Sequence, residues 1–283
     1  MYCKKIDLII LSILDNNKLF GYMFNKMKIF NKEYDIKTIN LDLSNFELKN
    51  LPVEIFNLIN LKMLDLSYNQ LNSLPIEISN LINLELLDLS TNQFNSFPIV
   101  ICDLINLSEL CLSNNQLNSL PVEIGKLINL IYLYLSNNKL CIFPVEICNL
   151  KKLRKISLPN NQLFSVPVEI SNLKNLHYLY LSNNKLNNIP AEIANIPYLQ
   201  TLDLKNNKLQ YLPIEILEIK YIIDIDTSSY DLDNLNIDNE ILIFNNLTNK
   251  FNNIPFNIKE IWLDKYLINH KLKLPFGCKI KYF

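Results

Sequence analysis

A proline recurs every 23 residues through the middle of this 283-residue chain, and this period constrains the fold more than any other feature. Around each proline runs the pattern LxxLxLxxNxLxxLPxEIxxLxN. The eight prolines are Pro52, Pro75, Pro98, Pro121, Pro144, Pro167, Pro190 and Pro213. A period of this length is typical of solenoids, in which one unit cannot bury its own apolar face and neighbouring units stack into one core.

Each unit is predicted to form one strand and one short helical turn. In the unit that contains Leu64 and Leu66, period-two alternation points these leucines inward and points Met63, Asp65 and Ser67 outward. The proline that follows fixes φ and ends the extended segment. The Glu-Ile-x-x-Leu spacing then favours a helical turn, with the Ile and the Leu facing inward. The Glu of each unit is expected to charge the start of that turn.

The asparagine in the middle of each unit is predicted to be structural. It lies where the chain turns out of the strand, and its amide offers both donors and an acceptor to the backbone groups of that turn. We expect Asn138→Ala to cost about 1–3 kcal/mol, whereas we expect Asn137→Ala, one residue earlier, to be near neutral. The column consists of Asn69, Asn92, Asn115, Asn138, Asn161, Asn184 and Asn207.

These residues resemble the leucine-rich repeat family. The half-unit LPxEIxxLxN is similar to the 23-residue intracellular class, which includes Ras-associated scaffold and plant Ras-group leucine-rich repeat proteins. The resemblance implies an α/β solenoid, a curved horseshoe with a concave parallel sheet and short helical or extended convex segments. It also implies a cytoplasmic, non-catalytic scaffold or adaptor that binds a protein on its concave face, with a Ras-like GTPase as one candidate partner.

Three segments are expected along the chain. Residues 1–37 are predicted to be an N-terminal cap, with a capping helix over the apolar run Ile6–Leu14, which Asp7 interrupts. Residues 38–221 hold eight repeats. Residues 222–283 are predicted to be degenerate, shorter repeats and a C-terminal cap, because the pattern decays and then partly recovers at Pro255 and Pro275, 20 residues apart. Ile258, Ile261 and Leu263 are predicted to form a strand there.

Composition argues against several classes of function. The chain has only three glycines, which excludes glycine-rich phosphate loops, and only two histidines. Its net charge of −1 gives no basic surplus for nucleic acid or anionic lipid, and no run approaches the ~20 apolar residues of a membrane span. We expect no cofactor, no metal and no membrane or nucleic-acid partner. We also expect no signal peptide, and a monomer.

The cysteines do not suggest catalysis or a disulfide. Cys111 and His177 lie three units apart, roughly 14 Å at strand spacing, beyond hydrogen-bond reach. Cys102 and Cys148 occupy the same position two units apart and are interpreted as core residues. Two other functions stay open: a substrate-recognition subunit of an enzyme such as a ubiquitin ligase, and a repeat-family paralogue without a dedicated partner.

Outward positions of the predicted strands mark a candidate partner-binding patch in units five to seven. Tyrosine and arginine are enriched at binding hot spots, and the patch contains the only arginine of the chain. We expect an acidic or phosphate-bearing protein surface to dock there, while Asp42, Asp65 and Asp88 repel the wrong orientation. The patch residues are Tyr132, Tyr134, Arg154, Lys155, His177, Tyr178 and Tyr180.

Overall fold

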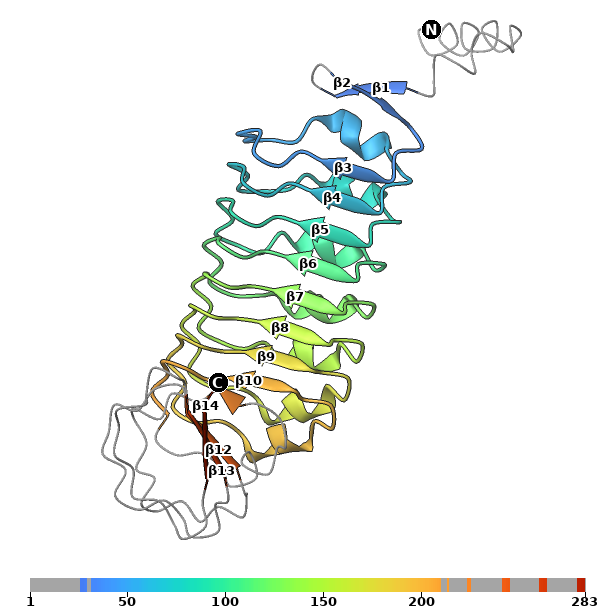
Figure 1. Cartoon of the computed structure of the whole chain (residues 1–283). Coiled ribbons are helices and arrows are strands. Elements are labelled where there is room, and N and C mark those ends of the chain that lie inside the picture. The colour runs from blue at the N-terminus through green and yellow to red at the C-terminus, as the bar shows by residue number, and fades with distance from the viewer. Residues whose placement is uncertain are drawn as a thin grey trace, which may run out of the picture.

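The computed structural model describes residues 26–29, 32–209, 213, 223–224, 241–244, 260–263 and 279–282. Its main body is a parallel sheet in which neighbouring strands follow chain order, nine strands among the described residues (Figure 1). The strands of this sheet are β3 Asn40–Asp42, β4 Met63–Asp65, β5 Leu86–Asp88, β6 Glu109–Cys111, β7 Tyr132–Tyr134, β8 Lys155–Ser157, β9 Tyr178–Tyr180, β10 Thr201–Asp203 and β11 Ile223–Asp224.

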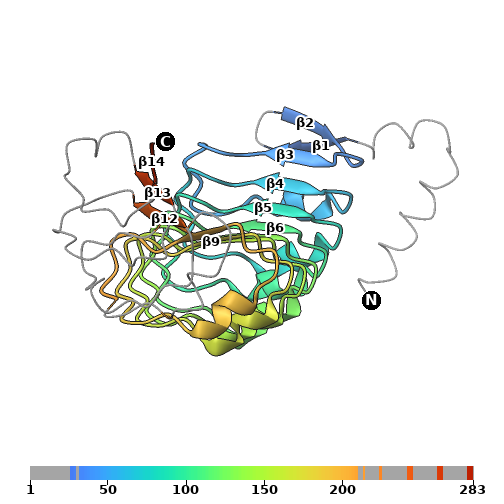
Figure 2. The same ribbon diagram turned by 60° about the horizontal axis from the view of Figure 1, so that its bottom comes forward.

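A short 3-10 helix follows each strand from β3 to β9 and lies on the face opposite the sheet (Figure 2). The predicted helical turn is therefore confirmed. Proline occupies the N-cap of every one, and Ile78 and Leu81 show why the spacing works: three residues make one 3-10 turn, so both side chains face inward and are fully buried. The helices are η1 Val53–Asn57, η2 Ile76–Asn80, η3 Ile99–Asp103, η4 Val122–Lys126, η5 Val145–Asn149, η6 Val168–Asn172 and η7 Ala191–Asn195.

The core lies between the sheet and the 3-10 helices and runs from unit to unit without a break. Leu64 and Leu66 are fully buried, while Met63 and Asp65 are half-buried on the outer face of the sheet, as predicted. Ser67 was predicted to face outward and is instead only 5% exposed. The prediction was wrong because β4 ends at Asp65, so period-two alternation does not extend to residue 67.

The asparagine column joins each unit to the one before it. The side-chain amide of Asn138 donates to the carbonyl of Leu112 at 2.9 Å, 26 residues earlier, and its Oδ1 accepts from the amide of Leu117 at 2.9 Å, 21 residues earlier. Asn207 repeats both bonds, to Leu181 and from Leu186. The same pair of bonds occurs in the units between, at Asn92, Asn115, Asn161 and Asn184.

The residue before each of these asparagines adopts a left-handed conformation. At Asn114 and Asn137 φ is 56° and 55°, and the same conformation holds at Tyr68 and Thr91. Asparagine tolerates this region well, whereas alanine there costs roughly 1–2 kcal/mol. The expectation that Asn137→Ala is near neutral is therefore corrected, because the substitution places alanine in a conformation that it disfavours.

Outside residues 40–209 the sequence predictions are only partly met. β1 (Lys26–Ile29) and β2 (Lys32–Asp35) form an antiparallel pair that was not predicted, while the predicted capping helix lies outside the described residues. β12 (Ile241–Phe244), β13 (Glu260–Leu263) and β14 (Lys279–Tyr282) form a second parallel sheet. The predicted strand at Ile261 and Leu263 is confirmed as β13.

The spacing between paired residues shortens toward the C-terminus. It is 23 residues from β3 to β10, as for Leu41 and Leu64, then 21 from Leu202 to Ile223. In the second sheet it is 19, as for Ile261 and Ile280, rather than the predicted 20. The C-terminal units are therefore shorter, as expected, and β11 lies where the sequence pattern had decayed. The division of the chain at residues 37 and 221 stays a prediction.

Candidate partner-binding surface

Three neighbouring strands carry the centre of the predicted patch. β7 places Tyr132 and Tyr134, β8 places Lys155, and β9 places Tyr178 and Tyr180, all on the outer face of the sheet. The register aligns Tyr132 with Lys155 and Lys155 with Tyr178. Between these positions the alternate residue of each strand is fully buried, which anchors the patch to the core; these residues are Leu133, Ile156 and Leu179.

The ammonium group of Lys155 lies between two tyrosine rings. Its Nζ is 5.0 Å from the ring centroid of Tyr134 and 5.3 Å from that of Tyr180, within the range of cation–π attraction. Burial raises the pKa of both tyrosines. Both hydroxyls therefore remain protonated at neutral pH and can donate hydrogen bonds to a bound anion, beside a fixed positive charge.

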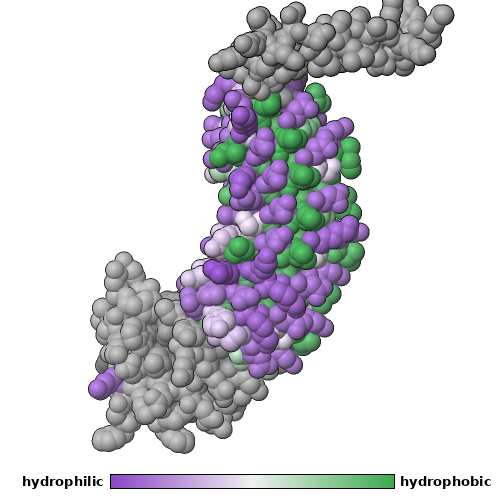
Figure 3. Space-filling view, turned by 90° about the vertical axis from the view of Figure 1, so that its right-hand side faces the viewer, coloured by the Kyte–Doolittle hydropathy of each residue, from purple (hydrophilic) through white to green (hydrophobic). Residues whose placement is uncertain are grey.

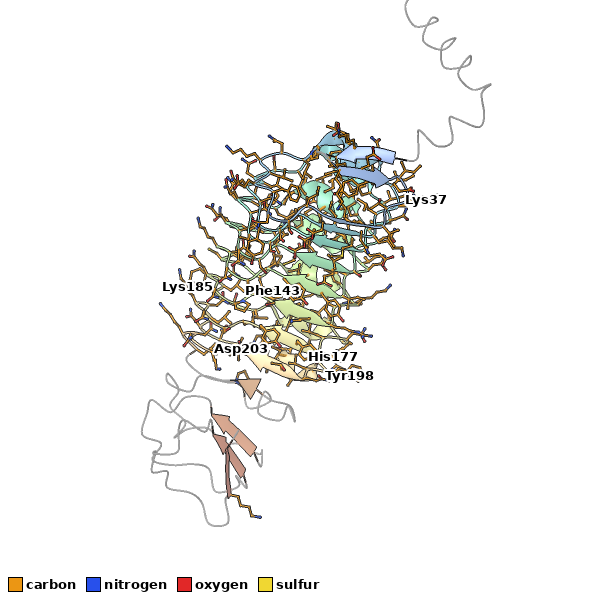
Figure 4. The ribbon with its side chains drawn as sticks, turned by 45° about the horizontal axis from the view of Figure 1, so that its top comes forward. Lys37, Phe143, His177, Lys185, Tyr198 and Asp203 are labelled. Atoms are coloured by element: carbon orange, nitrogen blue, oxygen red, sulfur yellow. The ribbon has the colours of Figure 1, made fainter. Side chains whose placement is uncertain are left out.

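His177 forms a separate aromatic group at the edge where β9 begins. Its ring stacks on Tyr198, with centroids 5.8 Å apart and planes 14° apart, and lies at 32° to the ring of Tyr178 (Figure 4). Its Nδ1 is 2.6 Å from the carbonyl oxygen of Asn175. Tyr178 belongs to both groups by position, so the rings continue from the sheet onto its edge.

Tyr198 is a residue that the sequence reasoning missed, although a signal was present. It occupies a position that is asparagine in five units, from Asn60 to Asn175. Those asparagines donate to a carbonyl 24 residues earlier, as Asn175 does to Lys151 at 2.8 Å. The exchange for an exposed tyrosine removes that bond and adds a ring beside His177.

Arg154 was predicted to join the patch and lies at the same edge, exposed, one residue before β8. Its carbonyl accepts the backbone amides of His177 and Tyr178. Its guanidinium makes no hydrogen bond or ion pair with any residue that the structure describes, so its charge is available to a partner.

The aspartates of the sheet have a structural task that the sequence reasoning did not assign. The carboxylates of Asp42, Asp65, Asp88 and Asp203 each accept the backbone amide two residues later, at 2.8–3.1 Å. Hydrogen bonds from Ser44 lower the pKa of Asp42. At the same position units four to seven lack aspartate and hold other residues; these are Cys111, Tyr134, Ser157 and Tyr180. The patch thus lies where the chain gives up this bond.

The cysteines lie as the repeat spacing implied. Cys111 and His177 are on β6 and next to β9, with β7 and β8 between them. Cys102 and Cys148 are buried free thiols on η3 and η5, and burial raises the pKa of Cys102 to about 11 and that of Cys148 to about 12. No group of three metal-ligating side chains occurs within the described ranges.

A search for membrane spans among the described residues finds no helix with the length and apolar character to cross a bilayer. No curated protein matches the chain.

Solved structures with the same architecture include bacterial and plant proteins. A leucine-rich repeat protein of Leptospira interrogans is 38% identical over 86% of this chain, with a TM-score of 0.63. This chain spans about half of that protein, 54% of its length. The plant peptide hormone receptor RGFR1 in complex with RGF2 is 26% identical over 82% of this chain and 41% of its own, with a TM-score of 0.55.

An internalin of Listeria monocytogenes is 18% identical over 89% of this chain and 85% of its own, with a TM-score of 0.55, and shows the fold alone. Two family matches cover consecutive parts of the sequence: the leucine-rich repeat region family over residues 36–158 and the leucine rich repeat family over residues 152–209. Together they span residues 36–209, more than half of the chain, and the parallel sheet with its 3-10 helices has the architecture of that family. The chain belongs to the leucine-rich repeat family.

Proposed function

We propose that this protein is a non-catalytic protein-binding module whose concave face receives a partner at β7, β8 and β9. The observation that carries the proposal is the placement of Lys155 between Tyr134 and Tyr180. Tyr134 and Tyr180 stand where other units have an aspartate that accepts a backbone amide. The sheet has given up two such bonds for two rings and a cation, which its own fold does not require.

The chemistry of this surface favours a partner that presents carboxylates or phosphates. Lys155 and Arg154 supply positive charge, and the tyrosine hydroxyls supply donors. At the other end of the sheet Asp42, Asp65 and Asp88 form a negatively charged column, and like charges disfavour an acidic partner there. The two ends together would set the orientation of an acidic partner along the sheet. The similarity to a peptide hormone receptor in complex with RGF2 supports a binding role for this kind of solenoid.

The test compares partner capture by the full chain and by a double variant, Tyr134→Ala with Tyr180→Ala. A matched control is Met63→Ala with Leu86→Ala, which removes two half-buried side chains at outward positions of β4 and β5. Proteins retained from extracts of the source cells are quantified by mass spectrometry, after circular dichroism has verified each fold. We expect the tyrosine variant to lose a partner that the control keeps. An unchanged set of partners in the tyrosine variant would refute the proposal.

A further inference from the structure

A second surface, on the edge where the strands begin, has features that the concave patch does not explain. Directly before the strand-start asparagines runs a column of isoleucines with exposures of 53–61%. Figure 3 shows hydrophobic side chains over the upper units of this side of the molecule and hydrophilic ones over the lower units. The exposed column consists of Ile59, Ile82, Ile105 and Ile128.

The same column changes from isoleucine to lysine between the fifth and sixth units. Lys151 and Lys174 occupy the next two positions, and both are exposed. Packing therefore does not require an apolar residue at this position, since the fold accepts lysine without a change in register. The four isoleucines form a contiguous apolar strip of the kind that marks interaction sites.

A groove of about 360 Å³ runs beside the isoleucine column. The side-chain amides of Asn83 and Asn106 donate to Ile59 and Ile82, while their oxygens accept no hydrogen bond from the described residues. Those oxygens can accept the N–H groups of an extended polypeptide. The residues along the groove include Asn83, Asn106, Ser108, Asn129, Ile131 and Lys152.

The lower end of the groove is basic. Lys152 reaches Asn129 at 2.7 Å, and Lys151 and Lys174 donate to the carbonyls of Cys148 and Asn195. With Arg154 they place four positive charges in two units, and no carboxylate of the described residues forms an ion pair with any of them. In a chain with a net charge of −1, this concentration is local.

We propose that this edge is a docking groove for an extended peptide segment of a partner protein, with apolar side chains over units three to five and carboxylates over units six and seven. From Ile82 to Lys174 the column spans four unit spacings, about 19 Å at the ~4.8 Å separation of strands, which about six residues of extended chain cover. The hydrogen-bonding groove favours a peptide over a flat membrane surface. This proposal does not depend on the concave patch.

The probes are synthetic peptides with three alternating leucines followed by three glutamates, made in both chain directions, and the same peptides with lysine in place of glutamate. Binding to the full chain is measured by fluorescence anisotropy at increasing salt. We expect one acidic peptide to bind, the lysine peptides not to bind, and affinity to fall with salt. Lys151→Glu with Lys174→Glu should weaken binding at least about tenfold, or about 1.4 kcal/mol. Ile105→Glu with Ile128→Glu should weaken it similarly.

The matched control is Lys139→Glu with Lys185→Glu. These lysines are also two units apart and hydrogen-bonded to a neutral side chain of the neighbouring unit, but they lie on the opposite edge from His177 and Tyr198, as Lys185 shows in Figure 4. The control, and Tyr134→Ala with Tyr180→Ala, should bind the peptide as the unmodified chain does. Equal binding of lysine peptides, equal loss in the control, or no binding at millimolar peptide would overturn the proposal. Binding to phosphatidylserine vesicles without peptide binding would also overturn it and assign the edge to a membrane.

Discussion

Removal of the Asn138 side-chain amide tests how the units hold together. In Asn138→Ala the three carbonyls that the amide contacts each keep another donor: Leu112 from Asn115, Leu135 from Asn161, and Ser136 from the backbone of Asn114. The amide of Leu117 does not, because Asn138 Oδ1 is its acceptor at 2.9 Å and no other acceptor is found among the described residues. The cost is therefore that of one buried, unpaired N–H, about 1–3 kcal/mol.

The assay is guanidinium unfolding of the full chain, followed by circular dichroism. The neighbouring residue supplies the control, provided that its left-handed conformation is respected. Asn137→Gly removes an exposed bond to Asn114 and keeps φ near 55° without strain, so we expect it to leave the midpoint almost unchanged. An Asn138→Ala midpoint equal to that of the unmodified chain, or an equal shift in Asn137→Gly, would refute the assignment of the bond.

Three further predictions follow from burial and from charge. Leu133→Ala should cost about 2–5 kcal/mol because the side chain is fully buried, whereas Ile142→Ser, at a residue 73% exposed, should leave the unfolding midpoint within error. Native Cys102 and Cys148 should resist alkylation at pH 8, since burial raises their pKa to about 11 and about 12, and peptide mass spectrometry would count against this if either is labelled before denaturation. Because hydrogen bonds lower the pKa of Asp42 in the fold, its stabilising contribution is present above the ordinary carboxyl pKa and is lost as pH falls through the lowered value; Asp42→Asn should therefore show a smaller loss of stability between pH 5 and pH 2, and an identical acid profile would contradict this.

The repeat made most of the main sheet predictable. Leu64 and Leu66 are buried because alternation within a strand is a local property, and the 23-residue spacing then fixes which side chains are neighbours. That spacing correctly aligned Lys155 between the units that carry Tyr134 and Tyr180. It did not predict that the ammonium lies between the rings, which depends on side-chain rotamers.

Other features lay beyond the reach of the pattern. The burial of Ser67 depends on where β4 ends, and the stacking of His177 on Tyr198 joins two positions that the strand alternation does not relate. The β1 and β2 pair and the 19-residue register of β12 to β14 have no leucine period to announce them. Each of these features follows from contacts specific to one place in the chain.

The constant 23-residue offset of the asparagine bonds makes whole units interchangeable in length. If recombination removed the sixth unit, Asn184 could bond to Leu140 and Leu135 as Asn161 now does, and the ladder would close again. The outer face would nevertheless change, since Tyr134 and Tyr180 would become direct neighbours with no lysine between them. Duplication or loss of one unit is thus a single genetic step that preserves the scaffold and creates a new surface, whereas the 19-residue units near the C-terminus cannot be exchanged with the central ones in this way.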